Sequence, residues 1–571
     1  MDALRTGLLW LDADPLRFWL TAWAAFGATI VLALRSSGDG PAANPPGGVR
    51  PQTWIFWASV GLTLAAFRWP SWFYPAALNP DEAQMIAGAI TLQRFPVYWK
   101  FVDGTTHGPL CEYLLLVPAW LGAPLNYVTA RVLAAGLEVV ALAGVWGALR
   151  CFAPERIARL AILPGLAFWS FASHDDFLHY ATELPGIALL SQAGWAIATA
   201  LAAPRPGRRP ALLLYLGGLC LGAVPFAKVQ SAPQAAALAA AAAVLWMIVR
   251  RPDPAAGRRG WGWLVLGGAT VPGIILALVL VYGLGSQFWY SYIVSNLAYA
   301  NLGEFPLREM PGRFFHVAAA SSAFAWFLAG GIGFALLYAR PGAGRPAAAR
   351  VGIVVAWILL GVAYACVIRS GREVPHYLNL MVVPVVTLSG FVLAGAAAEA
   401  VPDPAKARAR FAPLLCFALL TLAPQIGNRA SASPPFLGQL SAAPSAADSA
   451  AARFIRARAR PGDTLATWGW EPALYVETGL PQGTREAHTA CELTTWSMQE
   501  FYLRRYVVDL TRRRPAWFVD VVGPGSFIYE NRREFGHERV PEVNAVIEQD
   551  YEFLAEIGHQ RIYRIRDAAP K

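Results

Sequence analysis

Long apolar stretches separated by short polar connections occupy the first three quarters of the chain. These runs recur from Leu16 to Pro424, and most hold roughly 18–25 residues, which is enough for a helix to cross the hydrocarbon core of a bilayer. The pattern predicts a polytopic α-helical membrane protein with about 12 spans, in a range of 11–13. The candidate spans are residues 16–35, 53–70, 126–149, 157–173, 180–203, 211–227, 231–249, 261–285, 316–339, 351–368, 375–398 and 411–426.

The connections between these spans fall into two classes by charge. Five short loops, at residues 150–159, 204–210, 250–260, 340–350 and 401–410, each hold three or four Lys or Arg residues. Short basic loops stay in the cytoplasm. The other connections, which hold the acids, histidines and aromatic residues, are then expected on the outer face.

The outer loop at residues 71–125 contains two predicted helices. Residues 80–94 have a broad apolar face but are too few to span, which favours an interfacial helix. A second short apolar helix is expected at residues 110–121. The loop therefore has structure of its own at the edge of the membrane.

The last part of the chain differs in composition from the rest. An Ala/Ser/Pro-rich linker at residues 427–449 separates the membrane domain, residues 1–426, from a charged segment at 450–571. In this segment, expected helices alternate with expected strands, a pattern typical of a small αβα layer structure. The helices are expected at 450–460 and 493–512, and the strands at 464–470, 516–522 and 561–566.

Composition supports a membrane protein and limits the other classes. The 571 residues are 56% hydrophobic and 15% charged, whereas soluble proteins carry about 25% charged residues. The net charge of +10 does not indicate nucleic-acid binding, because most of the excess Arg lies in the short loops that set topology. The six cysteines form no CxxC pair and no metal-type spacing.

Two adjacent carboxylates open the first outer helix. Asp81 and Glu82 follow Pro80 at the edge of the bilayer, and ionisable residues placed there are a site hypothesis by default. The alternative is a plain helix start, because Pro suits the first turn and acids suit the positive end of the helix dipole.

Other polar residues gather in the outer loops. Asp175 and His179 share a helix face, as do Asp176 and Glu183, which fits either a site or a polar helix end. Lys228, Arg372 and His376 lie on the outer side, against the positive-inside trend, and cations there suggest an anionic ligand such as phosphate. For Lys228 the alternative is a side chain that snorkels from the end of a span.

Several motifs in this order resemble the GT-C superfamily of membrane glycosyltransferases, and more closely its protein O-mannosyltransferase-like branch, which includes the aminoarabinose transferases. The matching residues are Pro80-Asp81-Glu82, Asp103 with His107-Gly108-Pro109-Leu110, Arg372 with Pro375-His376-Tyr377-Leu378, and Gly462-Asp463 with Trp468-Gly469-Trp470-Glu471-Pro472. Gly108 departs from the Pro that is commoner there in the family. The resemblance covers most of the chain.

The resemblance implies a glycosyltransferase that uses a polyprenyl-phosphate-linked sugar and acts on the outer face. It implies that Asp81 is the general base and that Glu82 orients Asp81 or the acceptor, or helps to hold a metal. It also implies that Asp103 and His107 shape the acceptor side. Lys228, Arg372 and His376 would bind the donor phosphate, with Asp175, Asp176 and Tyr377 in support. Metal use varies in the family, so a divalent cation is compatible with this site but not required.

Two other functions would share much of this architecture. A flippase of lipid-linked saccharides should carry ionisable residues near the bilayer midplane and often has repeated halves, but the mid-span positions here are nearly free of charge and no half-repeat is visible. An oligosaccharide ligase or polymerase differs mainly in its donor. The acceptor is left open between a lipid, a glycan and a protein.

Overall fold

The computed structural model describes residues 2–35, 51–338, 345–399, 407–440 and 448–566, and the chain forms two compact units. Unit 1 comprises Met1–Trp72, Val132–Leu278 and Gly303–Ser441. Unit 2 comprises Phe73–Arg131, Val279–Leu302 and Ala442–Lys571. The outer loop after the second predicted span therefore belongs to the same compact unit as the C-terminal domain.

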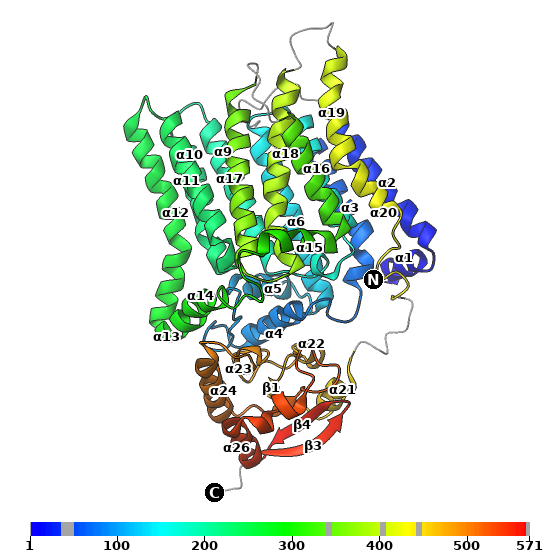
Figure 1. Cartoon of the computed structure of the whole chain (residues 1–571), viewed down its shortest axis with the longest axis vertical. Helices are drawn as coiled ribbons and strands as arrows, with labels where there is room; N and C mark the ends of the chain where they lie inside the picture. The colour runs from blue at the N-terminus through cyan, green and yellow to red at the C-terminus, as the bar shows by residue number, and fades with distance from the viewer. Residues whose placement is uncertain (1, 36–50, 339–344, 400–406, 441–447, 567–571) are drawn as a thin grey trace. The chain divides into compact units, whose positions relative to one another are not determined.

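Apolar helices make up most of the chain outside the C-terminal domain (Figure 1). Among the described residues, nine helical segments are long and apolar enough to cross a membrane. They are α2 (Pro15–Leu34), α6 (Tyr127–Arg150), α9 (Glu183–Ala202), α10 with η2 (Arg208–Phe226), η3 with α11 (Val229–Val249), α12 (Pro254–Val281), α17 (Ala347–Arg369), η5 with α18 (Pro375–Glu399) and α19 with α20 (Phe411–Ala430). The protein is an integral membrane protein, and a count of about 12 spans is not confirmed.

Three predicted spans account for the difference in count. The span at 316–339 corresponds to α15 (Met310–Ala320) and α16 (Ser322–Tyr338), which meet at 116° and would add a tenth span if the pair crosses as one. The span at 157–173 is divided between α7 (Glu155–Ala161) and α8 (Leu163–Phe171), each too short to cross alone.

The third is α3 (Pro51–Trp72), which is long enough but less apolar because it carries Arg68. The Arg68 side chain is 1% exposed, and its Nη1 donates to the Trp169 carbonyl at 2.9 Å and lies 3.5 Å from a Glu138 carboxylate oxygen. A buried cation needs such partners. α3 therefore uses polar contacts inside unit 1 rather than a uniformly apolar surface.

Contacts within unit 1 show which of its loops lie at the same end of the helices. At one end, Lys228 pairs with Glu183. At the other end, the Arg250 guanidinium donates to the Ala203 carbonyl at 2.7 Å, and Arg345 lies 3.2 Å from Glu399. The basic loops therefore lie together at one end of the helices, as the alternating charges predict. The side of the membrane that each end faces stays a prediction.

The C-terminal part of unit 2 contains a four-stranded sheet with the order β1-β2-β4-β3. The strands are β1 (Leu465–Trp468), β2 (Trp517–Asp520), β3 (Tyr551–Ile557) and β4 (Gln560–Ile565). β1 and β2 are parallel with Leu465 opposite Trp517, and the β2–β4 and β4–β3 pairs are antiparallel. β3 is absent from the predicted strands, because it lies at the sheet edge and most of its side chains are not buried.

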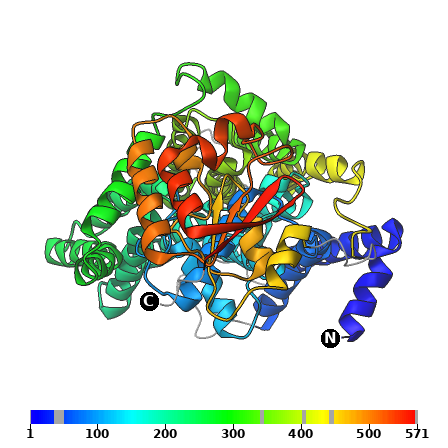
Figure 2. The same ribbon diagram turned by 90° about the horizontal axis from the view of Figure 1, so that it is seen from below.

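Helices cover both faces of this sheet, as predicted (Figure 2). The core on one face joins the sheet to α21 (Ala450–Arg456) and α22 (Ala473–Thr478), and the core on the other joins it to α24 (Gln499–Arg513) and α26 (Pro541–Asp550). Shorter helices in this part are α23 (Ala490–Leu493), α25 (Arg532–Phe535) and η8 (His537–Arg539).

The helix predicted at residues 80–94 is α4 (Pro80–Arg94), and it joins the core of unit 2. Its Ala87 packs in the same apolar cluster as Leu465 and Leu474, and the backbone N–H of Gln482 donates to Thr91 Oγ1 at 2.9 Å. The second predicted outer helix is α5 (Leu110–Trp120). The remaining segments in this unit are α13 (Gly285–Gln287), the π-helix η4 (Phe288–Val294) and α14 (Ser295–Tyr299).

Glycines allow α10 and α12 to pack closely in unit 1. A Cβ atom built on Gly218 would lie 2.1 Å from the Leu264 carbonyl oxygen, and one on Gly222 would lie 2.1 Å from the Gly268 carbonyl oxygen. Small residues spaced four apart are a common device for close contact between membrane helices.

We expect Gly222→Leu to separate α10 from α12 and to destabilise the detergent-solubilised protein by about 1–3 kcal/mol, the usual cost of overpacking. The measurement is the thermal unfolding midpoint. Gly273→Leu is the matched control, because Gly273 lies on the same helix pair and a Cβ atom added there would have nothing within 4 Å. Equal midpoints for both variants would contradict the packing argument.

Candidate functional site

The carboxylate pair lies at the beginning of α4, in unit 2. The Asn79 side chain caps this helix by accepting the Asp81 backbone N–H at 2.9 Å, and Pro80 is its first residue. The predicted helix start is therefore present. Asp81 is half-buried, whereas Glu82 is 0% exposed, so the two neighbours have different environments.

Glu82 is held by a buried arginine near the start of α6. Arg131 Nε donates to Glu82 Oε1 at 3.0 Å, and Nη2 donates to Oε2 at 2.8 Å. The same guanidinium donates to the carbonyls of Tyr74 and Ala76, each at 2.6 Å. One cation thus fixes the loop before α4 and both oxygens of Glu82, the residue that follows Asp81.

Asp103 takes part in a second buried charge network. Its Oδ1 accepts the Thr105 N–H at 2.9 Å, and its Oδ2 accepts a hydrogen bond from Arg505 at 2.5 Å. Arg505 comes from α24, and it also binds Glu486. Through Arg505, this buried network joins the loop around Asp103 to the C-terminal domain within unit 2.

His107 is paired with a carboxylate from the first turn of α5. His107 Nε2 lies 2.6 Å from Glu112 Oε1, and the two side chains are 2% and 1% exposed. Tyr98 donates to the same oxygen at 3.4 Å, and burial raises the pKa of Tyr98 well above its usual value, so the phenol stays protonated. His107 is thereby held in a fixed orientation.

A further histidine of unit 2, His488, lies within electrostatic reach of Asp81. His488 Nδ1 accepts the Ala490 N–H at 3.2 Å, so the neutral ring carries its proton on Nε2. Burial lowers the pKa of His488 to about 4, with Asp81 and Asp103 acting in the opposite direction through their charges. His488 is therefore neutral at physiological pH. The charge of Asp81 acts on its pKa.

The predicted phosphate-binding lysine lies in a polar cluster of unit 1. Lys228 forms a buried ion pair with Glu183, and its ammonium donates to Thr182 Oγ1 at 2.7 Å. The ammonium also lies 4.4 Å from the centroid of the Tyr377 ring. Because an ammonium has three protons, Lys228 can still donate to an incoming anion.

His376 and Asp176 lie in the same unit and contact each other. Asp176 Oδ2 lies 3.3 Å from both the backbone nitrogen and Nδ1 of His376. The Asp175 side chain is exposed, and its carbonyl oxygen lies 3.0 Å from His179 Nδ1. Arg372 is 3.9 Å from Glu304 in a more exposed pair. The structure thus brings Asp176, His376, Tyr377 and Lys228 to one end of unit 1.

One group of residues in the described chain has the composition of a metal site, Asp520, His537 and Glu538. Asp520 Oδ2 already accepts hydrogen bonds from Arg532 Nη1 at 2.9 Å and from His537 Nδ1 at 2.5 Å. A guanidinium therefore occupies the position that a divalent cation would need. Glu82 is likewise engaged by Arg131, so these residues do not fit a metal.

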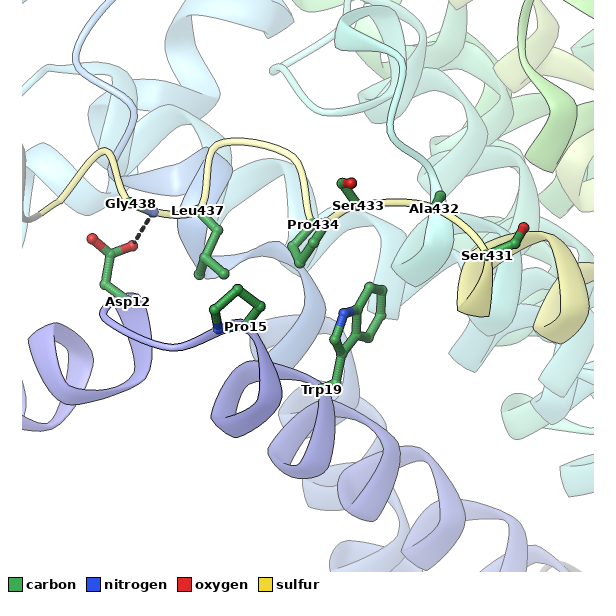
Figure 3. Close-up of a pocket in the computed structure, with 9 residues that line it drawn as sticks. All are labelled: Asp12, Pro15, Trp19, Ser431, Ala432, Ser433, Pro434, Leu437 and Gly438. Carbon is green, nitrogen blue, oxygen red and sulfur yellow. Dashed lines mark hydrogen bonds between the residues drawn. The ribbon is translucent and has the colours of Figure 1, made fainter.

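A surface groove of about 490 Å³ lies elsewhere in unit 1 (Figure 3). It runs between the beginning of α2, with Pro15 and Trp19, and the segment 431–438. α1 spans Asp2–Asp12, and Asp12 accepts the Gly438 N–H at 2.8 Å across the groove. None of the predicted site residues lines it.

Several residues of these networks are missing from the sequence prediction. Arg131 lies near the start of a predicted span on the outer side, against the positive-inside trend, and this position could have identified it. Glu112 could have been found as the acid in the first turn of α5. Arg505 and His488 had no such signal, because Arg505 is one of several arginines in α24 and is 402 residues from Asp103.

The carboxyl of Glu471, which follows Trp470 in the chain, is expected to make the stability of the fold depend on pH. Burial, with Glu477 nearby, raises its pKa from about 4.5 to about 7. The folded state therefore holds this proton more tightly than the unfolded state, and stability is lost as the pH rises from about 4.5 through 7, by at most about 3 kcal/mol.

We expect Glu471→Gln to remove this loss, so that the variant gains thermal stability over the wild type between pH 5 and pH 8. The unfolding midpoint is measured at both pH values. Glu552→Gln, at an exposed position on β3, is the control and should show no such gain. A Glu471→Gln difference that is independent of pH would refute the assignment.

The comparison with solved structures shows the fold of the chain. No protein-family model matches the sequence, and no curated protein matches it. Among solved structures, ArnT from Cupriavidus metallidurans bound to undecaprenyl phosphate is 14% identical, with a TM-score of 0.51 over 91% of this chain and 100% of ArnT. The oligosaccharyltransferase AglB from Archaeoglobus fulgidus, in complex with an inhibitory peptide and a dolichol-phosphate, is 13% identical, with a TM-score of 0.40 over 82% of this chain and 68% of AglB. The chain therefore shares the overall fold of the ArnT structure.

Proposed function

We propose that the protein is a membrane glycosyltransferase that moves a sugar from a polyprenyl-phosphate-linked donor to an acceptor, with Asp81 as the general base. The fold it shares with ArnT supports this class of reaction, since that structure contains undecaprenyl phosphate. We further propose that the reaction occurs on the periplasmic face of the bacterial inner membrane, from the charges of the loops.

The observation that carries this proposal is the contrast between Asp81 and the other carboxylates of unit 2. Glu82 and Asp103 are 0% and 3% exposed. Asp81 is only half-buried and lies at the beginning of a rigid helix. A general base must be reached by the acceptor, and Asp81 meets this requirement better than its neighbours do.

The chemistry needs few further groups. The acceptor O–H loses its proton to the Asp81 carboxylate while its oxygen attacks the anomeric carbon of the donor. The bond between that carbon and the phosphate oxygen breaks, and its electron pair leaves with the polyprenyl phosphate. Preorganised cations would stabilise the negative charge on the departing phosphate.

We assign the binding of the donor phosphate to Lys228, Arg372 and His376. Lys228 is held by Glu183 and Thr182, which fixes the ammonium and leaves one of its three protons available. Tyr377 and Asp176 hold Lys228 and His376 from neighbouring positions. In this proposal Asp103 and His107 shape the acceptor side through their buried partners.

We expect Asp81→Asn to lower the rate of transfer at least about a hundredfold, because an amide cannot accept the proton. The protein should still fold, since Asn79 rather than Asp81 caps α4. Transfer is measured with purified protein in nanodiscs and a panel of polyprenyl-phosphate hexoses and pentoses, and folding by the unfolding midpoint.

Asp253→Asn is the matched control. Asp253 accepts the Ala256 N–H at 3.0 Å at the beginning of α12, so it stands at another helix start without a proposed role, and its variant should transfer at the wild-type rate. Wild-type turnover by Asp81→Asn would leave Asp81 as part of a helix start only. A wild-type protein that moves lipid-linked sugars across vesicles without consuming any donor would be a flippase.

A further inference from the structure

The C-terminal domain contains an aromatic group, and one of its members, His488, lies within electrostatic reach of the proposed base. The Trp470 ring stacks on the His488 imidazole with their centroids 4.5 Å apart and an angle of 20° between the planes. Phe527 contacts the Trp470 ring edge to face at 5.1 Å and 80°. Phe527 is 45% exposed and its neighbour Ile528 is 62% exposed. We call Trp470, His488 and Phe527 the aromatic platform.

Two ring N–H groups of the platform are hydrogen-bond donors, those of Trp470 and His488. The Trp470 Nε1–H is buried and has no hydrogen-bond partner among the described residues. The neutral His488 ring carries its remaining proton on Nε2, as its bond with Ala490 requires.

Contacts inside unit 2 hold the platform beside the loop of the proposed base. The Asp103 N–H donates to the Arg485 carbonyl at 2.9 Å, three residues before His488. Arg505 binds Asp103 and Glu486 together. The His488 ring is also close enough to Asp81 and His107 for their charges to act on it.

We propose that the aromatic platform binds a pyranose ring of the acceptor, so that the hydroxyl presented to Asp81 belongs to a carbohydrate. An aromatic face with hydrogen-bond donors and acceptors at its edge suits a sugar ring, whose C–H groups are apolar on one face and whose hydroxyls point outward. An alkyl chain would leave the buried Trp470 indole N–H without a partner, which is costly. A serine or threonine hydroxyl of a peptide has no ring to stack.

This inference rests on the proposed function, and it specifies the acceptor class. In the step it implies, the sugar hydroxyl gives its proton to Asp81 and forms a bond to the anomeric carbon of the donor. The bond to the phosphate oxygen breaks, and the polyprenyl phosphate leaves with the electron pair. The product is a glycan that is one sugar longer.

The test uses the full-length protein in nanodiscs with the donor panel and three kinds of acceptor: disaccharides of glucose, mannose, galactose and N-acetylglucosamine, a serine-containing peptide, and a lipid alcohol. We expect transfer to at least one disaccharide. We expect Phe527→Ala to raise the acceptor KM about tenfold, as loss of an aromatic contact does, with an unchanged donor KM. Phe553→Ala is the matched control, because Phe553 is 53% exposed on β3 of the same domain, and it should leave both constants unchanged.

A second arm separates binding from turnover. The disaccharides are titrated calorimetrically into Asp81→Asn protein, with and without Phe527→Ala, and we expect binding that weakens about tenfold with the second substitution. Transfer only to the peptide or the lipid alcohol would overturn the carbohydrate acceptor and leave the glycosyltransferase standing. Transfer to disaccharides that is indifferent to Phe527→Ala would overturn the platform. Disaccharide binding without consumption of any donor would keep the platform and overturn the proposed function.

Discussion

The buried pair of Glu82 and Arg131 is the interaction on which the proposed site depends. A charge with no access to water is tolerated only when it is paired and hydrogen-bonded, and here both oxygens of Glu82 and two backbone carbonyls share one guanidinium. Since the carbonyls belong to the loop that leads into α4, the pair fixes the loop, the helix start and Asp81 together. Neither residue could be lost alone without leaving an uncompensated charge inside unit 2.

The same logic repeats farther along unit 2. Arg505 carries the charge balance for Asp103 and Glu486, and its guanidinium joins a loop from the first quarter of the chain to the C-terminal domain. A small soluble domain after a membrane bundle could be an independent appendage. Here its core includes Ala87 of α4, so the domain and the outer loop form one compact unit, and the domain can supply residues to the chemistry of the loop.

Local patterns predicted local structure well. α4 begins and ends where the sequence indicates, because Asn79, Pro80 and two acids make a strong helix start. The αβα layering was also predictable, whereas the edge strand β3 was not, because its exposed glutamates resemble a surface loop. The predicted span at 157–173 was wrong as a single helix, since its apolar run hides a break at Ile162 before Pro164.

The partners of the site residues were harder to predict. Hydropathy and motifs indicate Asp81, Lys228 and His376, but pairing with Arg505 or Glu183 depends on distances between segments far apart in the sequence. The measurement that tests the central claim most directly is a structure of the protein in nanodiscs with an unreactive phosphonate analogue of its polyprenyl-phosphate sugar donor. The account predicts a sugar whose anomeric carbon faces Asp81 at the beginning of α4. A bound donor whose sugar lies away from Asp81 would contradict it.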